Sequence, residues 1–318
     1  MGRKEILGRV RNTLFKAGFY VSEVFSIRPL SFDLIARRDN SLLIIKVLTN
    51  IDAISEDVAN ELKKLATLLN GSPIIIGERS GAGLLTDEVV YDRFGIYSIN
   101  TETLNIYLIE GVPPEIFAGP GGFYVTLDHE KLKKFRSEQN ISLGSFAKSL
   151  KVSRRTIQMY EGGMNTSVDI AIRIEDVLKT NITIPIDLLK QKIQKKEIKA
   201  QLTEKEKYRI FQKEIFSILE QVGYKVTPLK RAPFEAVSED KKEILLTCID
   251  EYNNRFVKKA QVISTISKIT EKYAVLITDK DLNKKSIKGT PIIIKKELKK
   301  TRGPEELLRL LLERLHIF

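Results

Sequence analysis

Residues 143–163 carry the most informative pattern of the chain and read LGSFAKSLKVSRRTIQMYEGG. The pattern predicts two short helices, over residues 143–150 and 154–161, with Ser142 and Ser153 as their N-caps. A small residue, Ala147, is needed where the second helix crosses the first, and Ile157 anchors the second helix to the core. The turn at 151–152 is too short to separate the helices, so they must pack against each other.

The second predicted helix begins with a polar outer face. In helix-turn-helix proteins the start of such a helix enters the DNA major groove. Arg and Gln side chains there can make bidentate contacts with base edges, and a helix N-terminus favours phosphate. Residues 128–163 hold eight Lys/Arg against four Asp/Glu, a net charge of +4 that suits backbone contact. We expect DNA contacts from Ser142, Ser153, Arg154, Arg155, Thr156, Gln158 and Met159; the alternative is a helical bundle without a DNA role.

The stretch over residues 143–163 resembles the Cro/λ-repressor-like (XRE) DNA-binding family. The resemblance rests on the small Ala147, the Val-Ser turn, the polar second helix and the closing Glu-x-Gly that begins at Glu161. Gly144 departs from the pattern, because many relatives carry Gln or Glu near it for a phosphate contact. The resemblance implies a DNA-binding domain in which Glu161 is structural.

A helical block over residues 123–190 surrounds this motif. Further helices are expected over residues 129–137, around Ile170 and Ile174, and as a short turn over residues 186–189, which makes a five-helix domain. The Gly-Pro-Gly-Gly cluster at 119–122 precedes the block, and a lysine-rich stretch with a net charge of +4 follows it at 190–207.

Residues 1–118 and 205–318 read as two α/β domains with the same order of helix, three strands, helix and strands, which predicts mixed sheets. A Gly-aromatic-x-Val hinge occurs at 18–21 and again at 223–226, and residues 42–45 fall without gaps on 244–247. We interpret this as an internal duplication. The alternative is that any two α/β domains share such an order of helices and strands. The fold class is therefore multidomain, α/β plus all-α.

The first α/β block is similar to restriction-endonuclease-like PD-(D/E)xK nucleases of the archaeal Holliday-junction-resolvase type. If it is active, Glu5, Asp33 and Lys46 are the candidate catalytic residues, with carboxylates on Mg²⁺ and the lysine on the attacking water. Ile44 stands where the motif requires its second acid. The matching positions of the last block are Glu235, Leu246 and Cys248. We therefore expect degenerate domains kept for dimerisation or DNA contact, and no bound metal.

Two features near the C-terminus allow two interpretations each. Residues 280–302 hold nine Lys/Arg against two Asp/Glu, and they either track phosphates or form a solvated face. A leucine stripe over residues 305–315 predicts a helix that either packs against its own domain or forms part of a dimer interface.

Composition excludes several classes of protein. The 318 residues carry a net charge of +12, which suggests a polyanion as partner. The single cysteine, Cys248, and two histidines permit neither a disulfide nor a zinc site. The apolar runs are strand-sized and no signal core begins the chain, so we expect a cytoplasmic protein without membrane contact or cofactor.

Over its whole length the chain resembles the archaeal HTH-type transcriptional regulatory proteins, through segments 32–37 and 42–50 and on through the helix-turn-helix. The resemblance implies a regulator rather than an enzyme, bound to double-stranded DNA. One recognition helix reads only a half-site, so we expect a homodimer on a pseudo-palindromic operator. The alternative function is a Mg²⁺-dependent, structure-selective nuclease. The sequence predicts no particular effector.

Overall fold

The computed structural model describes residues 1–25, 30–191, 193 and 209–315. These residues cluster into two compact units. The first comprises Met1–Ala17, Leu48–Ala53 and Ile74–Gln191, and the second comprises Gly18–Val47, Ile54–Pro73 and the chain from residue 192 onward. Apart from residues 190, 191 and 193, the lysine-rich stretch at 190–207 lies outside the described residues.

The first unit begins with the amphipathic helix α1 (Arg3–Lys16), whose buried side includes Ile6, Val10 and Leu14. The helix ends before Gly18, whose φ of +80° suits glycine. Helix α3 (Thr101–Asn105) and the π-helical turn that follows it (Ile106–Glu110) contact α1.

The strands of this unit run in the order β4-β8-β7-β9-β10-β11. β4 and β8 pair in parallel, as do β7 and β9, whereas β7–β8, β9–β10 and β10–β11 are antiparallel. The Gly-Pro-Gly-Gly cluster forms the turn of the β9–β10 hairpin, and β5 (Arg79–Ser80) pairs with β6 (Gly83–Leu84) in a small separate hairpin. The bounds of the sheet strands are β4 (Ser72–Ile76), β7 (Val89–Arg93), β8 (Ile96–Ile99), β9 (Ile116–Gly119), β10 (Gly122–Val125) and β11 (Thr166–Ser167).

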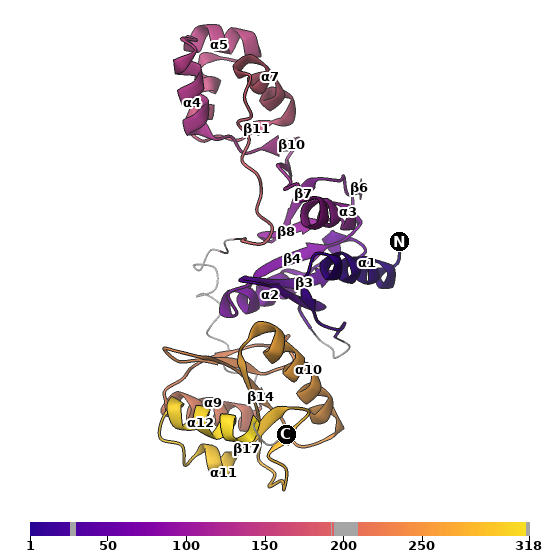
Figure 1. Cartoon of the computed structure of the whole chain (residues 1–318), viewed down its shortest axis with the longest axis vertical. Coiled ribbons are helices and arrows are strands. Elements are labelled where there is room, and N and C mark those ends of the chain that lie inside the picture. Colours follow the sequence, from indigo (N-terminus) through magenta and orange to yellow (C-terminus); the bar gives the residue numbers. More distant parts are fainter. Residues whose placement is uncertain (26–29, 192, 194–208, 316–318) are drawn as a thin grey trace. The chain divides into compact units, whose positions relative to one another are not determined.

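Four helices make up the helical block of this unit (Figure 1, magenta): α4 (His129–Glu138), α5 (Leu143–Leu150), α6 (Arg154–Glu161) and α7 (Val168–Leu178). They enclose a core that includes Leu132, Phe146, Leu150, Ile157 and Ile174. The short turn expected over residues 186–189, which was counted as a fifth helix, is not helical. The backbone N–H of Ile186 is donated to the carbonyl of Pro114, and Asp187 accepts from the N–H of Leu189, so these residues make a turn.

In the second unit, β1 (Tyr20–Val21), β2 (Leu34–Arg38) and β3 (Ser41–Val47) form an antiparallel meander. Asp39 takes the left-handed conformation in the β2–β3 turn, at a φ of +51°. Ser55 caps α2 (Glu56–Leu68) by accepting the N–H of Val58.

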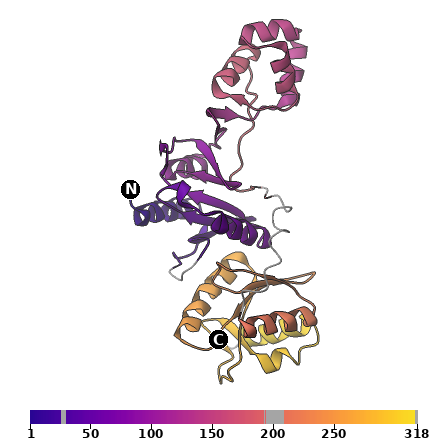
Figure 2. The same cartoon turned by 180° about the vertical axis from the view of Figure 1, so that it is seen from behind.

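The C-terminal residues of the second unit build a six-stranded sheet in the order β12-β13-β14-β15-β17-β16. Helices α9 and α12 pack on one face around Leu219, Leu307 and Leu311, and Figures 1 and 2 show α10 on the opposite face. The leucine-rich helix thus docks on its own domain. The bounds are α9 (Ile210–Val222), β12 (Lys225–Pro228), β13 (Ala236–Glu239), β14 (Ile244–Ile249), α10 (Asn254–Thr270), β15 (Tyr273–Thr278), β16 (Ser286–Ile287), β17 (Thr290–Ile294), α11 (Lys295–Leu298) and α12 (Pro304–Leu315).

The β2–β3 and β13–β14 hairpins have the same register. Leu34 pairs with Ile45 in the first, and Ala236 pairs with Thr247 in the second. The N–H of Asp33 is donated to Ile45 at 2.8 Å, and the N–H of Glu235 is donated to Thr247 at 2.9 Å. Position by position, the two hairpins correspond without a gap.

Candidate nucleic-acid interface

The turn between α5 and α6 is held by backbone hydrogen bonds. The hydroxyl oxygen of Ser142 accepts the N–H of Ser145 at 3.1 Å and so begins α5. Lys151 takes the left-handed conformation, at a φ of +56°, and the N–H of Val152 closes back on the carbonyl of Ala147 at 3.0 Å. This pairing satisfies carbonyls at the end of α5 and lets α6 begin two residues later.

Helix α6 buries one side and exposes the other. Ser153 caps it by accepting the N–H of Thr156 at 3.0 Å. Ile157 and Tyr160 are buried in the core of the helical block. The opposite side, at the start of the helix, therefore faces outward: Arg154, Arg155, Gln158 and Met159 are exposed, and Thr156 is half-buried. Five of the seven predicted contact residues lie together on this short helix, and the two serines serve as its cap and that of α5.

An ion pair ties the end of α6 to α4. The guanidinium of Arg136 donates to both carboxylate oxygens of Glu161, at 2.5 and 3.2 Å, and also to the carbonyl of Ile141 at 2.9 Å. Both side chains are nearly buried, with 13% and 10% of their surface exposed. The bidentate geometry fixes the direction of α6 relative to α4.

The guanidinium of Arg154 lies close over Gly144 of α5. A Cβ atom at position 144 would stand 2.6 Å from one terminal nitrogen of Arg154, well inside contact distance. Gly144 leaves room for this position of the Arg154 guanidinium, and a side chain at 144 would require the flexible arginine to shift.

The first nuclease-like site consists of a buried acid and lysine. Asp33, 1% exposed, accepts the N–H of Val47 at 2.9 Å, and the ammonium of Lys46 lies 3.6 Å from the same oxygen. Lys46 also donates to the carbonyl of Leu30 at 3.3 Å. Ile44 is fully buried in β3, as its apolar side chain requires.

Mg²⁺ requires several oxygen ligands in near-octahedral geometry. Asp33 is a single carboxylate that already accepts from a backbone N–H, and Ile44 supplies no oxygen. Glu5 is an exposed side chain of α1 that pairs with Arg9 at 3.6 Å. Asp33 and Lys46 by themselves therefore supply too few oxygen ligands for a magnesium ion.

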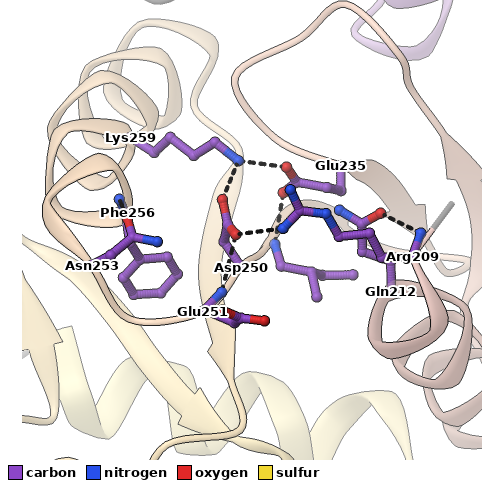
Figure 3. A network of polar contacts seen from close by, with 9 residues as sticks. Arg209, Gln212, Glu235, Asp250, Glu251, Asn253, Phe256 and Lys259 are labelled. Carbon is purple, nitrogen blue, oxygen red and sulfur yellow. Dashed lines mark hydrogen bonds and ion pairs between the residues drawn. The ribbon is translucent and has the colours of Figure 1, made fainter.

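The corresponding place in the C-terminal sheet holds a denser network (Figure 3). Glu235 accepts the N–H of Ile249 at 2.7 Å, as Asp33 accepts that of Val47. Lys259 reaches in from α10, and its ammonium lies 2.6 Å from Glu235 and 3.0 Å from Asp250. Burial disfavours the charged ammonium, but the adjacent Glu235 carboxylate outweighs this and raises the pKa of Lys259.

The sequence reasoning missed Lys259 and Asp250. Lys259 lies between Phe256 and Ile263, inside the apolar stripe of α10, and a lysine in such a stripe was the available signal. Asp250 directly follows β14, where a sheet edge brings polar side chains together. Cys248 occupies the position that matches Lys46, and burial raises the pKa of its thiol. Within the described residues, no group of three or more His, Cys, Asp and Glu side chains is placed to hold a metal ion.

Comparison with known proteins agrees with this architecture. Residues 3–114 match the model of a PD-(D/E)XK superfamily domain, and residues 132–184 match a helix-turn-helix model. The chain is thus of the class that joins a helix-turn-helix to a nuclease-like domain. No solved structure matches it. Among the described residues, none of the helices has the length and apolarity needed to span a membrane.

Relatives in archaea carry the provisional name of HTH-type transcriptional regulatory protein. Those of Methanosarcina barkeri and Methanosarcina acetivorans are 40% identical over 99% of this chain and 98% of their own length. That of Archaeoglobus fulgidus is 36% identical over 97% of both chains. The chain belongs to this family of archaeal HTH-type transcriptional regulatory proteins.

Proposed function

We propose that the chain is a sequence-specific DNA-binding transcriptional regulator that reads its operator through α6. The proposal rests on one observation: one side of α6 is buried in the core of the helical block, and the other side is exposed. Its buried side is fixed by Ile157, Tyr160 and the Arg136–Glu161 pair, while its exposed start presents two arginines and a glutamine. Arg binds guanine and Gln binds adenine through paired hydrogen bonds, so this face is suited to reading major-groove edges.

The residues of the interface divide by role. Arg154, Arg155 and Gln158 are proposed to contact bases, and Thr156 and Met159 to contact sugar, phosphate or the thymine methyl group. Ser142 and Ser153 already accept one backbone N–H each through their side chains. They are therefore proposed to act at the helix starts, where the remaining N–H groups favour phosphate.

A single recognition helix covers only a half-site, so the regulator is proposed to act as a homodimer on a pseudo-palindromic operator. Two copies of α6 would then lie about one helical turn, ~34 Å, apart along the DNA. The residues from 1 to 118 and from 205 to 318 are proposed to be two degenerate copies of one nuclease-like domain that support this assembly. The matching registers of the β2–β3 and β13–β14 hairpins support the duplication.

Gel-shift titration tests the role of α6. We expect Arg154→Ala/Arg155→Ala to lose both affinity and preference for operator over unrelated DNA, because it removes both arginines of the reading face. Lys241→Ala/Lys268→Ala is the matched control, since it removes the same charge from exposed positions in the C-terminal sheet domain. Binding by wild type should weaken steeply with salt. Unchanged affinity and selectivity in the α6 variant would contradict the proposal.

The match of residues 3–114 to a nuclease superfamily supports a second candidate, a Mg²⁺-dependent structure-selective nuclease. Its reactive residues would be Asp33 and Lys46, with Glu5 as a further carboxylate. Incubation with duplex, nicked and branched DNA in Mg²⁺ or Mn²⁺ tests it. Cleavage that disappears in Asp33→Ala would establish the nuclease; absence of cleavage, or cleavage that persists in Asp33→Ala, would exclude Asp33 chemistry.

A further inference from the structure

Two charged side chains of α2 contact backbone groups at the end of β12 and in the segment that follows it, within the second unit. One carboxylate oxygen of Glu61 accepts the N–H of Lys230 at 2.8 Å and that of Arg231 at 3.3 Å. The ammonium of Lys64 donates to the carbonyl of Pro228 at 2.6 Å. Lys64 is only 6% exposed, and a buried ammonium is costly unless it is hydrogen-bonded. The β12 carbonyl is therefore part of what stabilises this lysine.

A further contact lies directly before Asp33. The N–H of Ser31 donates to the carbonyl of Arg231 at 2.9 Å, and the Ser31 hydroxyl donates to the same oxygen at 3.2 Å. Ser31 is 1% exposed. The carbonyl of the adjacent Leu30 accepts from the ammonium of Lys46 at 3.3 Å. The backbone that covers the Asp33–Lys46 pair is thus held by the segment between β12 and β13.

The contacts are reciprocal between corresponding elements. The helices α2 and α10 each follow the third strand of their hairpin, and β2 corresponds to β13. While α2 contacts the segment before β13, α10 contacts β2. The guanidinium of Arg37 in β2 lies 2.6 Å from the carboxylate of Glu271, which follows α10. Such matching patches that face each other are typical of an interface with two-fold symmetry.

We propose that the two nuclease-like copies, residues 1–118 and 205–318, bind each other within one chain through this surface. The surface has the reciprocal pattern of a dimer interface, but its partner is the other half of the same chain, so a second chain cannot use it. The homodimer proposed above then forms through other residues. The inference rests on the proposed duplication and not on DNA reading by α6.

Hydrogen exchange of the full-length protein tests the pairing. In wild type, the peptide that contains Ser31 and the peptide that contains Lys230 and Arg231 should exchange slowly, at a rate independent of protein concentration. Glu61→Lys removes the acceptor of two N–H groups and adds a cation beside Lys230. It should speed exchange in both peptides about tenfold or more, the size expected for loss of a charged hydrogen bond. Glu56→Lys, the same change at an exposed position of α2, is the matched control and should leave both peptides unchanged.

Cross-linking identifies the chain that supplies the partner. Arg37→Cys/Glu271→Cys places two thiols at the ion pair for a short bismaleimide, and the native Cys248 is buried. In a mixture of isotopically light and heavy protein, the proposal predicts cross-linked peptides that are both light or both heavy. Mixed peptides would mean that a second chain occupies the surface and would overturn the proposal.

Absence of the cross-link would also overturn the proposal, as would wild-type exchange that is fast in both peptides or that slows as protein concentration rises. None of these measurements involves DNA. Their failure is therefore distinct from a failure of α6 to read an operator.

Discussion

Individual residues in this chain set the local packing and the pairing of charges. At Gly144, a Cβ atom would stand 2.6 Å from a terminal nitrogen of Arg154, so a side chain there would require the flexible arginine to move. With glycine at this position, the guanidinium of the first arginine of α6 lies close to the start of α5. The departure from the pattern is visible in the sequence, and the close approach of Arg154 only in the structure.

Tyr107 offers a pH-dependent test at the same scale. Its hydroxyl donates to Asp187 at 3.0 Å, and burial, followed by this hydrogen bond, raises its pKa from 10.0 to about 12. The folded state therefore holds the phenol proton at a pH where the unfolded chain releases it. The resulting contribution to stability is complete below pH 10 and is lost as pH rises towards 12.

Titration of tyrosinate absorbance checks this expectation. Wild type should show a late-ionising tyrosine that is missing from Tyr107→Phe, and unfolding experiments should show wild type losing more stability than the variant between pH 10 and pH 12. Identical late titration in the two proteins would assign the shift to another tyrosine.

At the scale of elements, local signals were sufficient for the helix-turn-helix. The Ser142 and Ser153 caps, the apolar spacing and the short turn are all encoded within a few residues, and α5 and α6 form at the predicted positions. The short turn at 186–189 that was counted as a fifth helix is not helical. The backbone N–H of Ile186 instead donates to the carbonyl of Pro114, a partner more than seventy residues away.

Long-range pairing also explains what was missed in the C-terminal sheet domain. Glu235 was recognised in the sequence as the position that matches Asp33. Its partner Lys259 lies on α10, and no local rule connects a helix position with a strand end. Only the packing of α10 against the sheet brings the lysine to the two acids.

The cap of α6 makes a prediction at this scale. Ser153→Ala removes the oxygen that accepts the N–H of Thr156, so it should destabilise the helical block by about 1 kcal/mol and weaken DNA binding. Chemical denaturation and gel shift measure the two effects. Ser145→Ala is the matched control, because it makes the same change on an exposed side chain of α5. Equal effects of the two changes would mean that the cap has no special role.

At the scale of the whole molecule, the charged side chains of the nuclease-like sequence and of the helix-turn-helix differ in their exposure to solvent. Asp33 and Glu235 are each buried beside a lysine of the same chain, whereas Arg154 and Arg155 are exposed. Part of the charge of the basic stretch over residues 280–302 is compensated within the chain too, since Lys295 and Lys299 pair with Glu214. Part of the net charge of +12 is thus compensated within the chain, while α6 presents two exposed arginines at its start.

Selection of binding sequences from a random pool of duplex DNA tests the central role of α6 most directly. Wild type should enrich a pseudo-palindrome whose half-sites lie about one helical turn, ~34 Å, apart. Arg154→Ala/Arg155→Ala should enrich no such sequence while it keeps its fold. Enrichment of the same sequence by the variant, or enrichment of no sequence by wild type, would contradict the account.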